Sequence, residues 1–348
     1  MRVLLLMDPF IRVPPDEYGG IERVIADLAD GLVRRGHTVT LWAAPGSRTM
    51  GALEPFGREG EWTRWSNVRN VALVTARFWR RPGRFDLVHN FGRLAYLAGV
   101  LRSDLPKVQT YMRPVNSENM RKVGALGARR VRFTAVSAAI RDTGAPGGGE
   151  WSVIYNCAPL AQFTARTDVG PRTAPLVFLG RLERCKGAHT AIAVAHRLGR
   201  PLVIAGNRST LPPEQQYFDH ELAPLFDGTL VKYVGPVDNV QKNELLGSAA
   251  ALLLPVEWEE PFPVVLPEAL LCGTPVIGFR RGGIPEGIDH ARTGFLCDTE
   301  EEMAAAVMRL AEIDRADCRA EGERRFSDEA VVGEYERLYA SLANGSAR

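Results

Sequence analysis

The sequence predicts an α/β protein made of two doubly wound parallel sheets, each covered by helices, that face a cleft. Three observations predict this class. Short apolar runs typical of buried strands alternate with segments of helical periodicity. The alternation stops at a polar, proline-bearing segment, residues 164–175, and then starts again. The 348 residues, 45% of them hydrophobic and 24% charged, suit two globular domains rather than a disordered chain.

The first series of elements predicts an N-terminal domain, residues 1–165. It opens with the apolar run 3–7, which is expected to form a buried strand. Apolar residues then recur at helical spacing from Ile21, and this helix is expected to end at Gly36. Further strands of this domain are expected at 37–44, 70–75, 86–89, 107–111, 131–136 and 152–154.

The second series predicts a C-terminal domain, residues 166–327, which is expected to bind the main ligand. Its strands are expected at 176–180, 201–206, 230–235, 250–256 and 274–279. Helical segments such as 188–198 and 301–312 separate them. The last segment, residues 328–348, contains a helical pattern that is expected to cross back onto the first domain.

The cysteines and the apolar runs argue against an exported or membrane-spanning protein. Five cysteines form no C-x-x-C pair, which argues against a disulfide framework and a zinc site and favours a reducing compartment. The N-terminal apolar run is too short for the core of a signal peptide, and no stretch approaches the roughly 18 apolar residues of a membrane span. We therefore expect a cytoplasmic protein.

Charge is unevenly distributed, although the net charge is only +2. Residues 58–132 hold 16 basic and 5 acidic residues, a local balance of +11, and the remainder carries 27 basic and 36 acidic residues. This asymmetry predicts an anionic partner for the first half, such as a phospholipid surface at the inner face of the membrane or a phosphorylated acceptor. An arginine-rich solvated face explains the charge equally well.

Two glutamates in the segment "WEEPFPVVLPE", Glu260 and Glu268, stand eight positions apart. Glu260 is expected in the loop after a strand, and Glu268 about one turn into a helix that ends at Gly273. Prolines are tolerated at the start of a helix because its first N–H groups lack partners. Both carboxylates can then face one site from different depths. A capping role explains one glutamate but explains the pair poorly.

Two further strand-to-helix loops carry groups that can bind an anion. Gly19 and Gly20 precede the first helix, where free N–H groups favour negative charge. Arg181 and Lys186 stand between a strand and a helix that starts near Gly187, which suits a diphosphate. A flexible loop explains the glycines, and surface ion pairs explain the cations.

The segments "GRLERCKG", "EPFPVVLPEALLCGTPVIGFRRGGIPE" and "TGFLCD" resemble the retaining GT-B glycosyltransferases of family 4. The resemblance covers nearly the whole chain and implies two Rossmann-like domains. It also implies that the E-x7-E pattern binds a nucleotide-sugar, with Glu268 on the ribose hydroxyls and Glu260, a catalytic residue, at the donor sugar.

The same resemblance implies roles for the flanking residues. Arg181 and Lys186 would bind the diphosphate, and the loop of Gly19 and Gly20 would close over it. Phe262 and Val264, within the E-x7-E segment, would also belong to the donor site.

The chain departs from the family pattern at three places. Pro263 stands where relatives often have glycine, and Pro267 directly precedes Glu268. Relatives commonly have H-x-H after the fourth strand, where this chain has His89 and Phe91. His89 is a catalytic candidate, since an ordinary histidine pKa suits proton transfer. A structural role for a lone histidine at a strand end is the competing interpretation.

The expected reaction is retaining transfer from a UDP-sugar, with UDP-glucose as the first candidate and GDP-mannose still open. The acceptor is expected to be a glycan, a lipid-linked molecule or another anionic molecule used in cell-envelope or exopolysaccharide synthesis. Neither a cofactor nor a metal is expected, and nucleic acid is not an expected partner. The alternatives are a protein that binds a nucleotide-sugar without transferring it, and an epimerase or phosphorylase of the same architecture.

Overall fold

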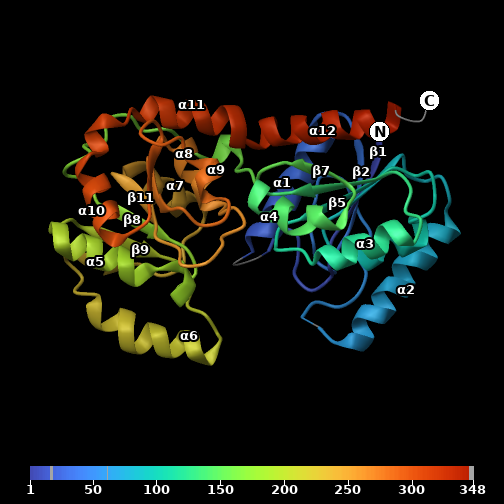
Figure 1. The fold of residues 1–348 in the computed structure, drawn as a ribbon, viewed down its shortest axis with the longest axis horizontal. Helices are drawn as coiled ribbons and strands as arrows, with labels where there is room; N and C mark the ends of the chain where they lie inside the picture. Colours follow the sequence, from blue (N-terminus) through green and yellow to red (C-terminus); the bar gives the residue numbers. More distant parts are fainter. Residues whose placement is uncertain (16–18, 61, 345–348) are drawn as a thin grey trace. The chain divides into compact units, whose positions relative to one another are not determined.

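The computed structural model describes residues 1–15, 19–60 and 62–344, and the chain forms two compact units. Unit 1 contains Met1–Tyr155 and the C-terminal segment from Asp328, and unit 2 contains Asn156–Ser327 (Figure 1). Each unit is a parallel sheet covered by helices. Among the described residues, no helix combines the length and the apolar character that crossing a bilayer requires.

The described part of unit 1 holds a seven-stranded parallel sheet in the order β3-β2-β1-β4-β5-β6-β7. The strands are β1 (Arg2–Leu6), β2 (Thr38–Trp42), β3 (Ala52–Leu53), β4 (Leu87–Asn90), β5 (Lys107–Tyr111), β6 (Val131–Ala135) and β7 (Glu150–Val153). In register, Leu4 of β1 pairs with Thr40 of β2 and Val88 of β4. The strand order reverses between β1 and β4, so the loops that follow these two strands diverge at that point.

The helices of unit 1 are α1 (Gly20–Arg34), α2 (Arg64–Arg80), α3 (Ser117–Ala125), α4 (Ala138–Gly144) and α12 (Asp328–Asn344), with short helices η1 (Leu94–Val100) and η2 (Ala145–Gly147). The strand expected at 70–75 is wrong, because these residues lie inside α2. A capping box between Thr63 and Ser66 starts the helix, and Val74 and Phe78 face the core one turn apart.

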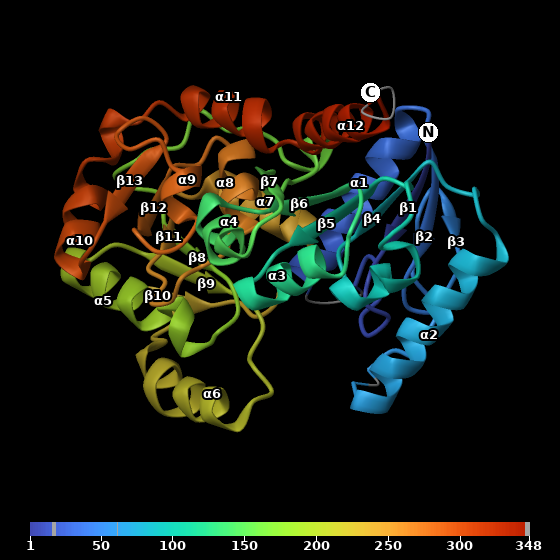
Figure 2. The same ribbon diagram turned by 45° about the vertical axis from the view of Figure 1, so that its right-hand side comes forward.

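Helix α12 packs along α1 within unit 1 (Figures 1 and 2). A Cβ at Gly31 of α1 would lie 2.6 Å from a methyl carbon of Val332, so only glycine permits this close approach. His37 Nε2 donates a hydrogen bond to the Glu336 carboxylate at 2.8 Å, which attaches the segment after α1 to α12.

The described part of unit 2 holds a six-stranded parallel sheet in the order β10-β9-β8-β11-β12-β13. The strands are β8 (Leu176–Leu179), β9 (Leu202–Ala205), β10 (Val231–Tyr233), β11 (Ala251–Leu254), β12 (Val276–Phe279) and β13 (Gly294–Cys297). Its helices are α5 (Ala188–Leu198), α6 (Pro212–Tyr217), α7 (Asn239–Ser248), α8 (Val265–Leu271), α9 (Ile284–Gly287), α10 (Glu300–Met308) and α11 (Arg315–Phe326). Short helical turns are η3 (Leu160–Gln162), η4 (Arg184–Lys186), η5 (Phe218–Leu222), η6 (Ala223–Leu225) and η7 (Leu310–Glu312).

Unit 2 begins about ten residues before the boundary expected at residue 165, because residues 156–165 bond to its elements. The Ala158 amide donates to the carbonyl of Phe326 at 3.0 Å. Arg319 donates to the carbonyl of Phe163 at 2.8 Å. These bonds give hydrogen-bond partners to backbone groups of the connecting segment that would otherwise have none within the sheet.

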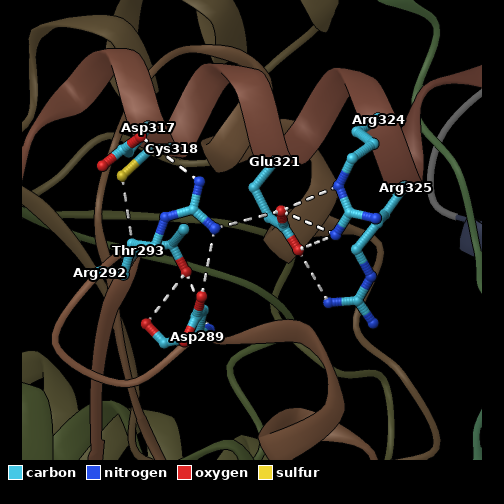
Figure 3. Close-up of polar contacts among 8 residues, drawn as sticks. All are labelled: Asp289, Arg292, Thr293, Asp317, Cys318, Glu321, Arg324 and Arg325. Carbon is cyan, nitrogen blue, oxygen red and sulfur yellow. Dashed lines mark hydrogen bonds and ion pairs between the residues drawn. The ribbon is translucent and has the colours of Figure 1, made fainter.

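Helix α11 is fixed to the loop before β13 by charges around Glu321 (Figure 3). Glu321 is buried and accepts hydrogen bonds from Arg324 at 2.8 Å and Arg325 at 3.2 Å. Arg292, from the loop, lies 3.9 Å from the same carboxylate and also pairs with Asp289. Burial alone would raise the pKa of Glu321, but the bonds from Arg324 and Arg325 outweigh it, so the pKa lies below its ordinary value.

Candidate functional site

The strand order of unit 2 reverses between β8 and β11, and in open parallel sheets ligands bind at the carboxyl ends of the strands at such a point. The loop after β8 carries Arg181 and Lys186, and the loop after β11 carries Glu260. The two loops touch. Gly187 has φ +75°, and a Cβ there would lie 1.9 Å from the carbonyl oxygen of Pro255. Glycine therefore allows these loops to meet.

Glu260 is almost fully buried and is held by two donors. Lys186 Nζ and Trp258 Nε1 each donate to Glu260 Oε2 at 2.6 Å. The Lys186 ammonium also lies 5.0 Å from the centroid of the Trp258 ring, within range of a cation–π contact. Because both donors use Oε2, Oε1 is oriented by the same contacts and can accept a hydrogen bond from a ligand hydroxyl.

Glu268 lies in α8 and forms a second buried lysine–glutamate pair. Its Oε1 accepts from Lys242 Nζ of α7, and the two side chains are 7% and 13% exposed. Burial and, to a lesser extent, the negative charge of Glu268 raise the pKa of the nearby Cys272 thiol to about 12. Lys242 was not predicted as a site residue, because the sequence of α7 shows only a capping box at its start.

Arg181 and Val264 are partly exposed, whereas Phe262 is buried. Arg181 donates to the carboxylate of Glu183 and keeps 36% of its side chain exposed. Val264 is half-buried at the start of α8. The Phe262 ring packs against Phe326 at 5.4 Å between centroids. Phe262 therefore anchors the loop through its ring, and this burial argues against a side-chain contact to a donor.

His89 does not have the geometry of a catalytic base. The side chain is fully buried at the end of β4, and its Nδ1 and Nε2 are bonded to Tyr339 Oη at 2.5 Å and Thr110 Oγ1 at 2.6 Å. The Phe91 ring lies 3.9 Å away between centroids. Burial holds the pKa of His89 well below its ordinary value of 6.5, so the ring stays neutral. These contacts favour the structural interpretation of His89 over the catalytic one.

The loop of Gly19 and Gly20 lies at the strand reversal of unit 1. Gly19 precedes α1, Gly20 begins it, and a Cβ at Gly19 would lie 2.8 Å from Glu22 Oε2. Burial raises the pKa of the Glu22 carboxyl and of Asp8, which follows β1, while Arg113 opposes the shift at both. Neither Glu22 nor Asp8 was predicted as a site residue, although Glu22 lies only two residues after Gly20.

Asp8 is held in place by its neighbours in unit 1. Tyr96 Oη donates to Asp8 Oδ1 at 3.0 Å, and Arg93 Nε lies 3.4 Å from the same oxygen. Together with Glu22 and Arg113, these groups place two carboxylates and two cations at the strand reversal. Within the described ranges, no three histidine, cysteine, aspartate or glutamate side chains gather as metal ligands would.

Family models match both halves of the chain. The model described as "Glycosyltransferase Family 4" matches residues 18–162, and the model described as "Glycosyl transferases group 1" matches residues 168–328. The first range begins after β1 and includes the other strands of unit 1, and the second range includes the whole sheet of unit 2.

Individual proteins are similar to the chain over much of its length. The glycogen synthase of Mycobacterium tuberculosis is 28% identical over an alignment of 367 positions, which covers 88% of this chain and 85% of that protein. The D-inositol 3-phosphate glycosyltransferase of Pseudarthrobacter chlorophenolicus is 30% identical over 260 positions, covering 63% and 60%. The crystal structure of AviGT4, a glycosyltransferase involved in avilamycin A biosynthesis, is 26% identical with a TM-score of 0.73 and covers 99% of this chain and 98% of that one.

Proposed function

The chain belongs to the family 4, group 1 glycosyltransferases of GT-B fold, and from this premise we propose that unit 2 binds a nucleotide-sugar whose sugar is transferred with retention to an acceptor hydroxyl. The single observation that carries the proposal is the presence of two buried lysine–glutamate pairs beside the strand reversal. Desolvation makes even a paired buried charge costly, so two such pairs at the place where ligands bind in parallel sheets favour a binding role.

When the donor binds, Lys186, Glu260 and Glu268 would form hydrogen bonds with it in place of the bonds within the two pairs. Lys186, with Arg181, would bind the diphosphate, because cations form strong charge-assisted hydrogen bonds with phosphate oxygens. Glu268 would accept from the ribose hydroxyls and Glu260 from the sugar, since a carboxylate can accept from two vicinal hydroxyls. Lys186, Glu260 and Glu268 would each keep a polar partner throughout, and in the free protein the two pairs hold these side chains in place.

The chemistry of transfer follows from these assignments. Positive charge from Lys186 and Arg181 stabilises the departing nucleoside diphosphate, as fixed charges do in other transfer reactions. A leaving phosphate oxygen can accept the proton of the incoming hydroxyl on the same face of the sugar, which gives retention and requires no histidine. We also propose that transfer needs no metal. Activity that survives a chelator and is unchanged by added Mg²⁺ would agree with this, and activity restored only by a metal would contradict it.

The donor is proposed to be a UDP-sugar, with UDP-glucose tested first and GDP-mannose second. The acceptor is proposed to be an anionic glycan or lipid-linked molecule that binds unit 1, in cell-envelope or exopolysaccharide synthesis. The excess positive charge of residues 58–132 and the exposed Arg113 support an anionic acceptor. The similarity to a protein named as a D-inositol 3-phosphate glycosyltransferase also supports a phosphorylated acceptor.

Release of nucleoside diphosphate from a panel of UDP-, GDP- and ADP-sugars tests the proposal. We expect slow hydrolysis of one donor, and Glu260→Gln should abolish it while the folded protein still binds nucleotide. The matched control is Glu244→Gln, since Glu244 is exposed and pairs with Arg166, which has no proposed role in donor binding. Binding without any turnover, with or without acceptors, would favour a binding protein. Conversion of the donor sugar with no diphosphate release would favour an epimerase.

A further inference from the structure

The outward face of helix α2 carries an exposed apolar stripe. Trp65 is 83% exposed, Val68 63% and Trp79 71%. Ala72 and Ala76 lie between them, so the stripe repeats at three and four residues and occupies one side of the helix. Isolated exposed apolar residues are ordinary, but a continuous stripe that includes two tryptophans indicates a binding surface.

The opposite face of α2 already attaches the helix to unit 1. Val74 and Phe78 are buried, and the Phe78 ring lies 5.1 Å from the Trp42 ring between centroids. Arg77 also turns inward and donates to the carbonyls of Glu54 and Pro55. Trp79 also donates through Nε1 to the carbonyl of Gly99 in η1 at 3.1 Å, whereas Trp65 and Val68 are exposed on the side of the helix away from the sheet. Figures 1 and 2 show α2 at the periphery of unit 1.

Charge around the stripe selects the kind of partner. Helix α2 contains four arginines and no acidic residue, and Arg64, Arg69 and Arg80 are exposed beside the stripe. A second copy docked on the same face would bring these arginines against one another, which is unfavourable. Duplex nucleic acid would match the charge, but its bases are already stacked and would leave the tryptophans and Val68 without an apolar environment.

We propose that α2 docks on an anionic phospholipid bilayer and lies in the plane of its interface. Tryptophan favours the boundary between headgroups and acyl chains, and an amphipathic helix buries its apolar face at this depth. Each arginine near an anionic surface adds electrostatic attraction that salt weakens. This inference does not depend on the identity of the donor or on transfer activity, and it gives unit 1 a means of reaching a lipid-linked acceptor.

Vesicle flotation of the full chain tests the proposal. The parent should bind vesicles of phosphatidylcholine mixed with phosphatidylglycerol, bind pure phosphatidylcholine at least about tenfold more weakly, and lose binding as salt rises. The double variant Trp65→Ser with Val68→Ser should lose about tenfold or more in affinity, and Arg64→Gln with Arg80→Gln about tenfold. Thermal unfolding of each variant should match that of the parent, because these side chains face solvent.

Matched controls are placed on unit 2. Met308→Ser removes an apolar side chain that is 67% exposed, and Arg172→Gln with Lys232→Gln removes two exposed charges. Both controls should float like the parent. The proposal is overturned if the parent does not bind the anionic vesicles or if the α2 variants bind them as tightly as the controls do. It is also overturned if the double variant Trp65→Ser with Val68→Ser changes only concentration-dependent dimerisation or only binding to duplex DNA.

Discussion

Substituting the two members of the Lys186–Glu260 pair should change the affinity for UDP in opposite directions. Lys186 Nζ lies 2.6 Å from Glu260 Oε2, and the two side chains are 13% and 8% exposed. The electrostatic attraction between the two charges is therefore strong. Lys186→Gln removes a cation assigned to the diphosphate and leaves the Glu260 carboxylate beside the incoming phosphates. Glu260→Gln removes that carboxylate and frees Lys186 to bind phosphate.

The expected sizes follow from ordinary interaction energies. A hydrogen bond to a charged group contributes about 1.5–3 kcal/mol, so Lys186→Gln should weaken UDP binding by about 10- to 100-fold. A largely buried pair that also competes with solvent is worth about 1 kcal/mol net, so Glu260→Gln should strengthen UDP binding by roughly fivefold. The same Glu260→Gln variant should lose transfer activity.

Isothermal titration calorimetry with UDP at fixed salt and pH measures both effects. Lys232→Gln, an exposed lysine of β10, controls for loss of general positive charge and should bind UDP like the parent. Thermal unfolding of each variant confirms that the protein is folded at the titration temperature. Weaker binding by Glu260→Gln to the same extent as by Lys186→Gln would refute the proposed exchange of partners.

Four further substitutions test other parts of the account. Glu268→Ala should weaken UDP binding about 10- to 100-fold by calorimetry, since a ribose contact to a charged group is lost, and an unchanged affinity would remove Glu268 from the site. His89→Asn should keep the transfer rate within a few-fold of the parent, whereas a loss of about 100-fold or more would restore its catalytic role. Because the pKa of His89 is lowered in the fold, the unfolded chain binds the extra proton. The parent should therefore lose stability as pH falls below about 6.5, by up to about 1.4 kcal/mol per pH unit, and denaturant titrations of His89→Asn should show a smaller loss. Glu321→Gln should lower the free energy of unfolding by about 2–3 kcal/mol in the same titrations, and a change below about 0.5 kcal/mol would show that the arginines find other partners. Gly187→Ala should be strained at φ +75° and should reduce both stability and UDP affinity, so parental values for both would contradict the tight contact between the two loops.

The architecture was predictable because strand and helix periods alternate so regularly. A buried parallel strand appears in the sequence as a short apolar run. The run 3–7 covers all of β1 except Arg2, and the run 176–180 contains β8. The segment 70–75 was wrongly predicted as a strand because its valines and threonine favour strands. A longer window would have shown apolar residues at 71, 74 and 78, the helical spacing that packing against Trp42 selects.

The candidate site was partly predictable for a related reason. Glu260 and Lys186 follow strands of one sheet, so their proximity could be inferred from chain order. Lys242 could not be found in this way, since its contact with Glu268 depends on how α7 packs beside α8. The burial of His89 could not be predicted from the sequence either, because its partner Tyr339 lies 250 residues further along the chain.

The most direct measurement of the central claim is a crystal structure of the protein with UDP bound. The account predicts the diphosphate within hydrogen-bond distance of Lys186 and Arg181 and the ribose hydroxyls on Glu268, with both lysine–glutamate pairs rearranged. UDP bound at another place, with the Lys186–Glu260 and Lys242–Glu268 pairs left as they are in the free protein, would contradict it.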